Sequence, residues 1–160
     1  MVDSCYSLHR AVWQSGEDGN EDTVKALLEA GAHVNERDPF TGDFPLFIAV
    51  TYKLKFCAQL LLEKRADPNQ EHALTGATPL LEALGAVQPQ LVIMLLEAGA
   101  DATQVNILND FPLRVIVHAI ARHPDDQLIC VRALLAKGAT YKSLPPALMR
   151  MPHVRMLLFS

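Results

Sequence analysis

The sequence predicts an all-α protein in which copies of one helical hairpin stack side by side as a solenoid. Pro-Leu pairs recur almost in step at 45–46, 79–80 and 112–113, and a leucine-rich segment follows each pair. Leu46 and Leu80 are 34 positions apart, and Arg65 and Gly99 are also 34 positions apart. Because two independent landmarks share this spacing, we interpret the chain as a repeat array.

Aligned on these landmarks, the chain divides into four units and a clipped fifth within a single domain, residues 1–160. The units span about 1–37, 38–71, 72–105, 106–141 and 142–160. Each full unit should contain a helix, a tight turn, a second helix and an extended link. The fifth unit lacks that link, because only seven positions separate Gly138 from Pro145, against fourteen from Arg65 to Pro79.

Prolines and glycines mark the expected ends of the helices. A proline suits the first turn, where its missing N–H costs nothing, so each Pro-Leu pair should open a first helix. Pro89, Pro124 and Pro152 should open the second helices of units three, four and five, and Pro145 should open the short helix before the last. A glycine after the leucine run suits a helix end with positive φ, but unit two has Arg65 there and should be strained.

The second helices share an apolar stripe that one hairpin cannot cover alone, so neighbouring units must stack. The stripe consists of Val24, Leu27 and Leu28, then Leu60, Leu61 and Leu62, then Val92, Leu95 and Leu96, then Val131, Leu134 and Leu135.

The overall composition limits the classes of partner. Half of the residues are apolar and 6% are aromatic, which fits one helical domain with a continuous core. A net charge of −4 gives no electrostatic reason to expect nucleic acid or an anionic membrane as a partner. Three cysteines without tight spacing fit a reducing compartment, and the first residues lack a signal-peptide pattern. We therefore expect an intracellular monomer, in the cytoplasm or the nucleus.

Thr78-Pro79-Leu80 in unit three and Leu8-His9-Arg10-Ala11 in unit one resemble the ankyrin repeat family. Its unit of about 33 residues opens with Thr-Pro-Leu-His-x-Ala. The resemblance spans nearly the whole chain and implies an ankyrin-type helix-turn-helix solenoid with short finger loops, four repeats and a truncated C-terminal capping repeat. It also implies that His9 ties adjacent turns. Phe44 and Phe111 replace the motif's threonine, which should change the hydrogen bonds at those turns.

In such solenoids the first helices and the finger loops line a concave face on which partners dock. The residues that the register places there are Trp13, Gln14, Thr51, Tyr52 and His118 on the helices, and Phe40, Asp43, Leu74, Ile107, Leu108 and Asp110 on the fingers. Exposed aromatic residues in such a row are typical of binding hot spots. Two alternatives stay open: Trp13 caps the N-terminal end, or Phe40, Ile107 and Leu108 pack against the next finger.

The resemblance implies a non-catalytic protein–protein interaction module that binds another protein or peptide and needs no cofactor. Acidic residues near Trp13 in the sequence (Glu17, Asp18, Glu21 and Asp22) favour a basic or neutral peptide. The alternative function is an adaptor that recruits a ubiquitin ligase or another enzyme through residues 144–148 and delivers a bound protein to it. Whether binding inhibits, scaffolds or delivers is open.

Residue patterns for catalysis or metal binding are weak. His118 and His123 are five apart, unlike the i, i+4 pair of a metal-binding helix. Cys57 and Cys130 occupy equivalent positions in their second helices and are interpreted as core residues. Asp125-Asp126 should complement a helix dipole rather than act as an acid–base pair. We therefore expect no enzymatic activity and no metal site.

Three further expectations concern modification, insertions and the chain ends. Asn35 and Asn69 each follow a leucine by eight positions, where the resemblance implies a hydroxylation site. The excess residues near 15–20 and 121–126 should form longer loops, which are either functional or neutral. The initial methionine and the cap-like last unit favour a complete protein.

Overall fold

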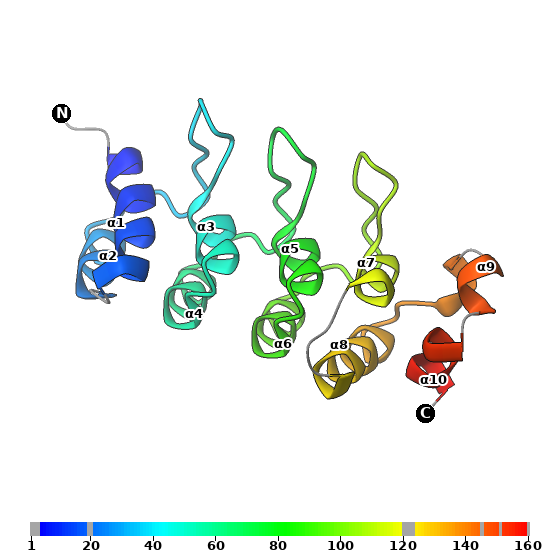
Figure 1. The fold of residues 1–160 in the computed structure, drawn as a ribbon. Coiled ribbons are helices and arrows are strands. Elements are labelled where there is room, and N and C mark those ends of the chain that lie inside the picture. Colours follow the sequence, from blue (N-terminus) through cyan, green and yellow to red (C-terminus); the bar gives the residue numbers. More distant parts are fainter. Residues whose placement is uncertain (1–3, 19–20, 120–123, 145, 151, 160) are drawn as a thin grey trace.

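The computed structural model describes residues 4–18, 21–119, 124–144, 146–150 and 152–159, and within these ranges it contains helices and no strand. Figure 1 shows helical hairpins stacked in one row, with three finger loops projecting from the same side of the stack. This arrangement confirms the predicted all-α solenoid.

Each predicted unit forms an antiparallel pair of helices. The pairs are α1 (Ser4–Asp18) with α2 (Glu21–Glu29), α3 (Pro45–Thr51) with α4 (Lys55–Glu63), α5 (Pro79–Gly85) with α6 (Pro89–Glu97), and α7 (Pro112–His118) with α8 (Pro124–Ala136). After a 3₁₀ turn, η1 (Tyr141–Ser143), the chain ends with α9 (Pro146–Met149) and α10 (Pro152–Phe159). Fingers precede α3, α5 and α7, but in the described residues between α8 and α9 the 3₁₀ turn η1 takes the place of a finger. The short spacing between Gly138 and Pro145 predicted this difference.

Proline begins most of these helices, as predicted. The three Pro-Leu pairs open α3, α5 and α7, and Pro89, Pro124 and Pro152 open α6, α8 and α10. Pro145 lies outside the described residues, and α9 begins at Pro146. At the N-caps, the Thr78 hydroxyl accepts a hydrogen bond from Leu81 N at 3.3 Å. Phe44 and Phe111 make no such bond, so the predicted change in capping is confirmed.

The second helices end with a residue of positive φ. Gly31, Gly99 and Gly138 have φ values of 86°, 98° and 94°. Arg65 takes the same conformation with φ 66°, a left-handed geometry that costs a non-glycine residue about 1–3 kcal/mol. The strain predicted for unit two is therefore present.

The core runs along the stack because first helices pack on first helices and second helices on second helices. Val24, Leu61, Val92, Leu95 and Leu134 are fully buried, so the predicted stripe faces this core. At the C-terminal end, α10 packs against α8, and Leu144 and Val154 are buried. The last helix, α10, thus covers part of α8.

The excess residues of unit one are not simply a loop. Helix α1 continues to Asp18, so residues 15–18 extend the helix, and the predicted loop is wrong for them. Ser15 tolerates this position because its buried hydroxyl donates to Val12 O at 2.7 Å, a local bond that helical serines commonly make. Gly19 and Asn20 lie outside the described residues.

The excess of unit four is divided in the same way. Residues 121–123 lie outside the described residues, whereas Pro124, Asp125 and Asp126 form the first turn of α8 and lengthen that helix. The two carboxylates stand at the positive end of the helix dipole, where we expected them. Among the described helices, none combines the length and the apolar character that crossing a membrane requires.

Candidate partner-binding surface

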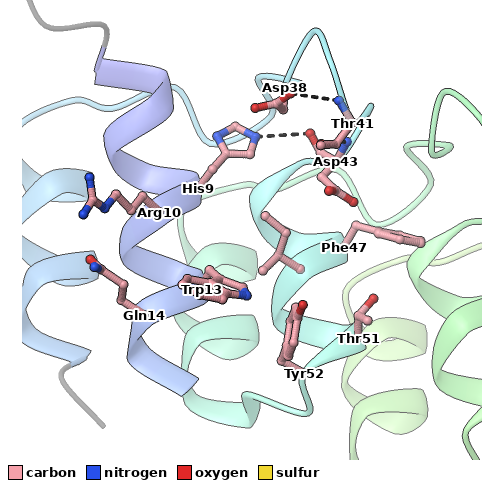
Figure 2. A pocket seen from close by; sticks show the side chains of 11 residues that line it. His9, Arg10, Trp13, Gln14, Asp38, Thr41, Asp43, Phe47, Thr51 and Tyr52 are labelled. Atoms are coloured by element: carbon pink, nitrogen blue, oxygen red, sulfur yellow. Dashed lines mark hydrogen bonds between the residues drawn. The ribbon is translucent and has the colours of Figure 1, made fainter. Parts of the chain in front are cut away.

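A hollow of about 530 Å³ lies between α1, α3 and the first finger, residues 38–43 (Figure 2). We call it the aromatic hollow. Its lining consists of His9, Arg10, Trp13, Gln14, Asp38, Thr41, Asp43, Phe47, Ile48, Thr51 and Tyr52. The structure therefore brings together five of the predicted partner-binding residues: Trp13, Gln14, Asp43, Thr51 and Tyr52.

Two large aromatic side chains form one end of this hollow. Trp13 is 43% exposed and Tyr52 is 54% exposed, whereas apolar side chains close to them in the sequence are buried. Trp13 lies on α1 and Tyr52 directly follows α3, and these two helices pack against each other. Figure 2 shows both rings at the same end of the hollow. Their exposure places hot-spot residue types where a partner can reach them.

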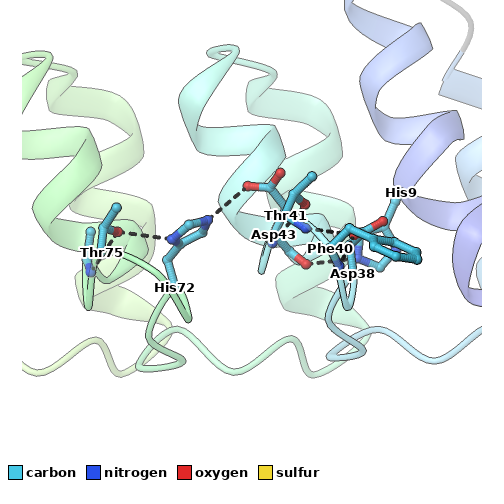
Figure 3. Close-up of polar contacts among 8 residues, drawn as sticks. His9, Asp38, Phe40, Thr41, Asp43, His72 and Thr75 are labelled. Atoms are coloured by element: carbon cyan, nitrogen blue, oxygen red, sulfur yellow. Dashed lines mark hydrogen bonds and ion pairs between the residues drawn. The ribbon is translucent and has the colours of Figure 1, made fainter.

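Asp43 forms the opposite end of the hollow and is held by two histidines from different units. His9 Nε2 donates to the Asp43 backbone oxygen at 3.2 Å, which confirms that His9 ties adjacent turns. His72 Nε2 lies 3.3 Å from Asp43 Oδ1, and the His72 ring stacks on Phe47 with centroids 4.7 Å apart (Figure 3). Asp43 thus links the first three units of the stack.

Both ring nitrogens of His72 have polar neighbours. Nε2 lies within ion-pair distance of the Asp43 carboxylate. Nδ1 is 3.0 Å from the Thr75 hydroxyl, and the tautomer decides which of these two atoms donates the hydrogen bond. A buried histidine thus has a polar contact at each ring nitrogen. Our sequence interpretation missed His72, although it stands 34 positions after Asp38, at the equivalent place of the next finger.

A second carboxylate, that of Asp38, lies at the base of the first finger. Its Oδ1 accepts backbone hydrogen bonds from Phe40 N at 2.8 Å and from Thr41 N at 2.9 Å. The bond from Thr41 N has the larger effect and the bond from Phe40 N the next largest, and both lower the pKa of Asp38. The carboxyl group therefore keeps its negative charge. The loop is closed by a bond from Asp38 N to Asp43 O at 2.7 Å.

The finger tips are apart from the hollow and remain exposed. Phe40 is 90% exposed and Leu74 and Ile107 are each 70% exposed, as is much of Leu108. Ile107 nevertheless contacts a neighbour, because a Cβ added to Gly76 would lie 2.6 Å from Ile107 Cγ1. Gly76 belongs to the preceding finger. Ile107 therefore packs against a neighbouring finger, as one of the two alternatives expected, but against the finger before it and not the one after it.

The remaining predicted residues line a separate, smaller hollow beside α7. Asp110 and His118 lie there with Arg114, Val115 and Ala119, in a volume of about 410 Å³. Arg114 Nε forms an ion pair with Asp110 Oδ1 at 3.6 Å. The predicted row is thus divided in two, because the exposed residues at the end of α5, Gly85 and its C-cap Ala86, are small.

Asn35 and Asn69 have the same structural role in successive units. Asn35 Oδ1 accepts from Asp67 N at 2.8 Å and Asn69 Oδ1 accepts from Asp101 N at 2.7 Å. Their amide groups donate to Arg65 O at 3.3 Å and to Gly99 O at 3.0 Å. Both side chains therefore join one unit to the next, and a hydroxylation site at these residues stays a proposal.

Two cysteines, Cys57 and Cys130, lie on second helices away from both hollows. Cys57 and Cys130 are 1% and 0% exposed, which confirms them as core residues. Burial, the larger cause, and the charge of Asp126 raise the pKa of the Cys130 thiol to about 11, and burial also raises the pKa of Cys57. Within the described ranges no group of three or more histidine, cysteine or acidic residues is placed to hold a metal ion. His123 lies outside those ranges.

Stacked helical hairpins with projecting fingers and a lined concave face define a class of helical repeat proteins that bind partners. A family model described as "Ankyrin repeats (3 copies)" matches residues 8–106, well over half of the chain. The chain belongs to the ankyrin repeat family. No curated protein was found to match it. Members of this family are generally non-catalytic modules that interact with other proteins.

Proposed function

We propose that this protein is a non-catalytic interaction module that binds another protein through the aromatic hollow and the adjoining fingers. The single observation that carries the proposal is the half-exposure of Trp13 and Tyr52 on one hollow of about 530 Å³. A volume of this size is within the range of binding pockets, and these two residue types dominate the energetics of many interfaces.

The polar contacts of Asp43 support the same function. His9 and His72 hold the backbone and the side chain of this residue from both sides, so the end of the hollow is formed before a partner arrives. A preformed surface loses little conformational entropy on binding. We propose that the module is a cytoplasmic monomer with four repeats and a truncated capping repeat in one domain.

Affinity capture from the native cell tests this function, with wild-type protein and the Trp13→Ala/Tyr52→Ala double variant as baits. The matched control is Phe56→Ala, because Phe56 is 48% exposed on the second helix α4, outside the hollow. We expect the double variant to lose partners that the wild type and the control both retain. Equal capture by all three baits, with equal thermal unfolding temperatures, would refute the assignment.

The adaptor alternative receives less support from the C-terminal segment. Leu144 and Val154 are buried at the C-terminal end of the stack, where α10 packs on α8, so these two side chains are part of the core. In this alternative a recruited enzyme would bind residues 144–148, and the exposed Met156 and Phe159 would extend that surface. Loss of a ubiquitin-ligase subunit from the capture by a Met156→Ala/Phe159→Ala variant would favour this alternative.

A further inference from the structure

We propose that the aromatic hollow seats an arginine side chain of the partner, with its guanidinium between the aromatic rings and the Asp43 carboxylate. The inference rests on the proposed function and specifies the chemistry of the partner segment. Three features of the hollow carry it: two exposed aromatic rings, a carboxylate held in place, and an excess of negative charge.

The first feature is the pair of rings at one end. Trp13 and Tyr52 are both about half exposed, so their faces are open to a side chain entering from solvent. The faces of these rings attract cations, and a planar guanidinium also stacks on them. An apolar anchor could use the rings too, but it would make no hydrogen bond or ion pair with the carboxylate at the other end of the hollow.

The second feature is that the carboxylate at the other end is oriented in advance. His72 contacts Asp43 Oδ1, and the Asp43 side chain is 34% exposed. A carboxylate has two oxygens with several acceptor positions, so a guanidinium can donate to this group while the histidine contact persists. Charge-assisted hydrogen bonds of this kind are stronger than neutral ones. The fixed position lowers the entropic cost of forming them.

The third feature is the charge of the lining. Asp38 and Asp43 contribute two negative charges and Arg10 contributes one positive charge, which leaves the lining with an excess of one negative charge. Figure 2 shows the Arg10 side chain pointing away from the space between Trp13 and Tyr52. A cationic side chain therefore meets rings and carboxylates rather than the one cation of the lining, while an acidic side chain would be repelled.

Arginine fits this combination better than lysine. Its guanidinium is planar, so it can stack on a ring and donate to a carboxylate at the same time, and it is more weakly hydrated than an ammonium group. The hollow, about 530 Å³, is large enough for the side chain and part of the backbone that bears it. The ligand class is thus a partner segment with an exposed arginine.

The single tryptophan of the chain provides the measurement, because its indole N–H gives one signal at the site itself. The probe is the tripeptide acetyl-Gly-Arg-Gly-amide, titrated into the full-length protein and followed by nuclear magnetic resonance. We expect a saturable indole shift. We expect at least tenfold weaker binding for the tripeptide with uncharged citrulline in place of arginine, and weaker binding for the lysine tripeptide.

Variants of the protein test whether the tripeptide binds in the aromatic hollow. Tyr52→Ala and Asp43→Asn should each weaken the arginine tripeptide at least fivefold, whereas Phe56→Ala should bind it as the wild type does. Tyr52 is exposed, so its replacement tests the site even if Asp43→Asn disturbs the fold. Equal affinity for arginine and citrulline, equal affinity for lysine, no indole shift at all, or unchanged binding by Tyr52→Ala would each overturn the inference.

The two proposals can fail separately. If capture depends on Trp13 and Tyr52 but the arginine tripeptide gives no shift, the docking surface stands and the arginine inference falls. If the tripeptide binds as expected but the double variant captures every partner, the arginine site stands and the docking function falls.

Discussion

His72 Nε2 lies 3.3 Å from Asp43 Oδ1, although the two residues belong to different fingers of the stack. Two further contacts hold the imidazole in place: the Thr75 hydroxyl lies at Nδ1, and the Phe47 ring stacks on the face of the imidazole. Figure 3 shows that His9 approaches the same aspartate from α1. The position of the Asp43 carboxylate in the hollow therefore depends on the units before and after it.

Replacing His72 should destabilise the protein by about 1–3 kcal/mol, because the variant loses a ring contact and a hydrogen bond in a buried place. The measurement is urea unfolding of His72→Ala. The matched control is His33→Ala, since His33 is exposed in the link after α2. Unfolding midpoints that shift equally for both variants would show that the His72 contacts contribute no net stability.

Arg65→Gly should stabilise the protein by up to about 1 kcal/mol, because glycine adopts positive φ without the steric cost. The gain is limited, since glycine also increases the conformational entropy of the unfolded chain. Arg65→Ala is the control, because it removes the charge and keeps the Cβ. Urea midpoints measure both. An equal or greater gain for alanine would mean that the charge, and not the backbone conformation, is the source of strain.

Two phenylalanines four positions apart should differ strongly in what their truncation to alanine costs in stability. Phe44 is fully buried and its ring lies 5.5 Å from that of Phe47, whereas Phe40 is 90% exposed at a finger tip. Phe44→Ala should cost about 3–5 kcal/mol, the usual loss for a buried aromatic residue. Phe40→Ala should leave the unfolding free energy unchanged within about 0.5 kcal/mol. A large loss for Phe40→Ala in urea unfolding would indicate that this finger tip packs in solution.

Stability should fall as the pH rises above about 9, in part through Cys130. Its folded pKa of about 11 exceeds the ordinary thiol value of 9.0, so the unfolded chain loses this proton first. The unfolded state then binds fewer protons than the folded state, and ionisation favours unfolding. Urea midpoints at pH 8 and pH 10 measure the effect in wild type and in Cys130→Val. The variant should lose less stability between these pH values, and an identical loss would exclude a contribution from Cys130.

Much of the candidate surface could be predicted from register alone. Trp13, Thr51 and Tyr52 stand near the ends of equivalent first helices, and the structure places all three on one hollow. Register could not show that the finger tips lie apart from this hollow. That separation depends on how far the loops project, which the repeat spacing does not specify.

The sequence by itself determined the hairpin repeat, the helix starts at proline and the strained end at Arg65. These features follow from backbone chemistry within one unit, which is the same wherever that unit lies. Only the tertiary structure decided the contact between His72 and Asp43, the packing of Ile107 on Gly76 and the continuation of α1 through Ser15. The first two are contacts between neighbouring units, and a small change in the distance or rotation between those units would separate the atoms involved. The third depends on the burial of the Ser15 side chain, which the sequence of one unit does not specify.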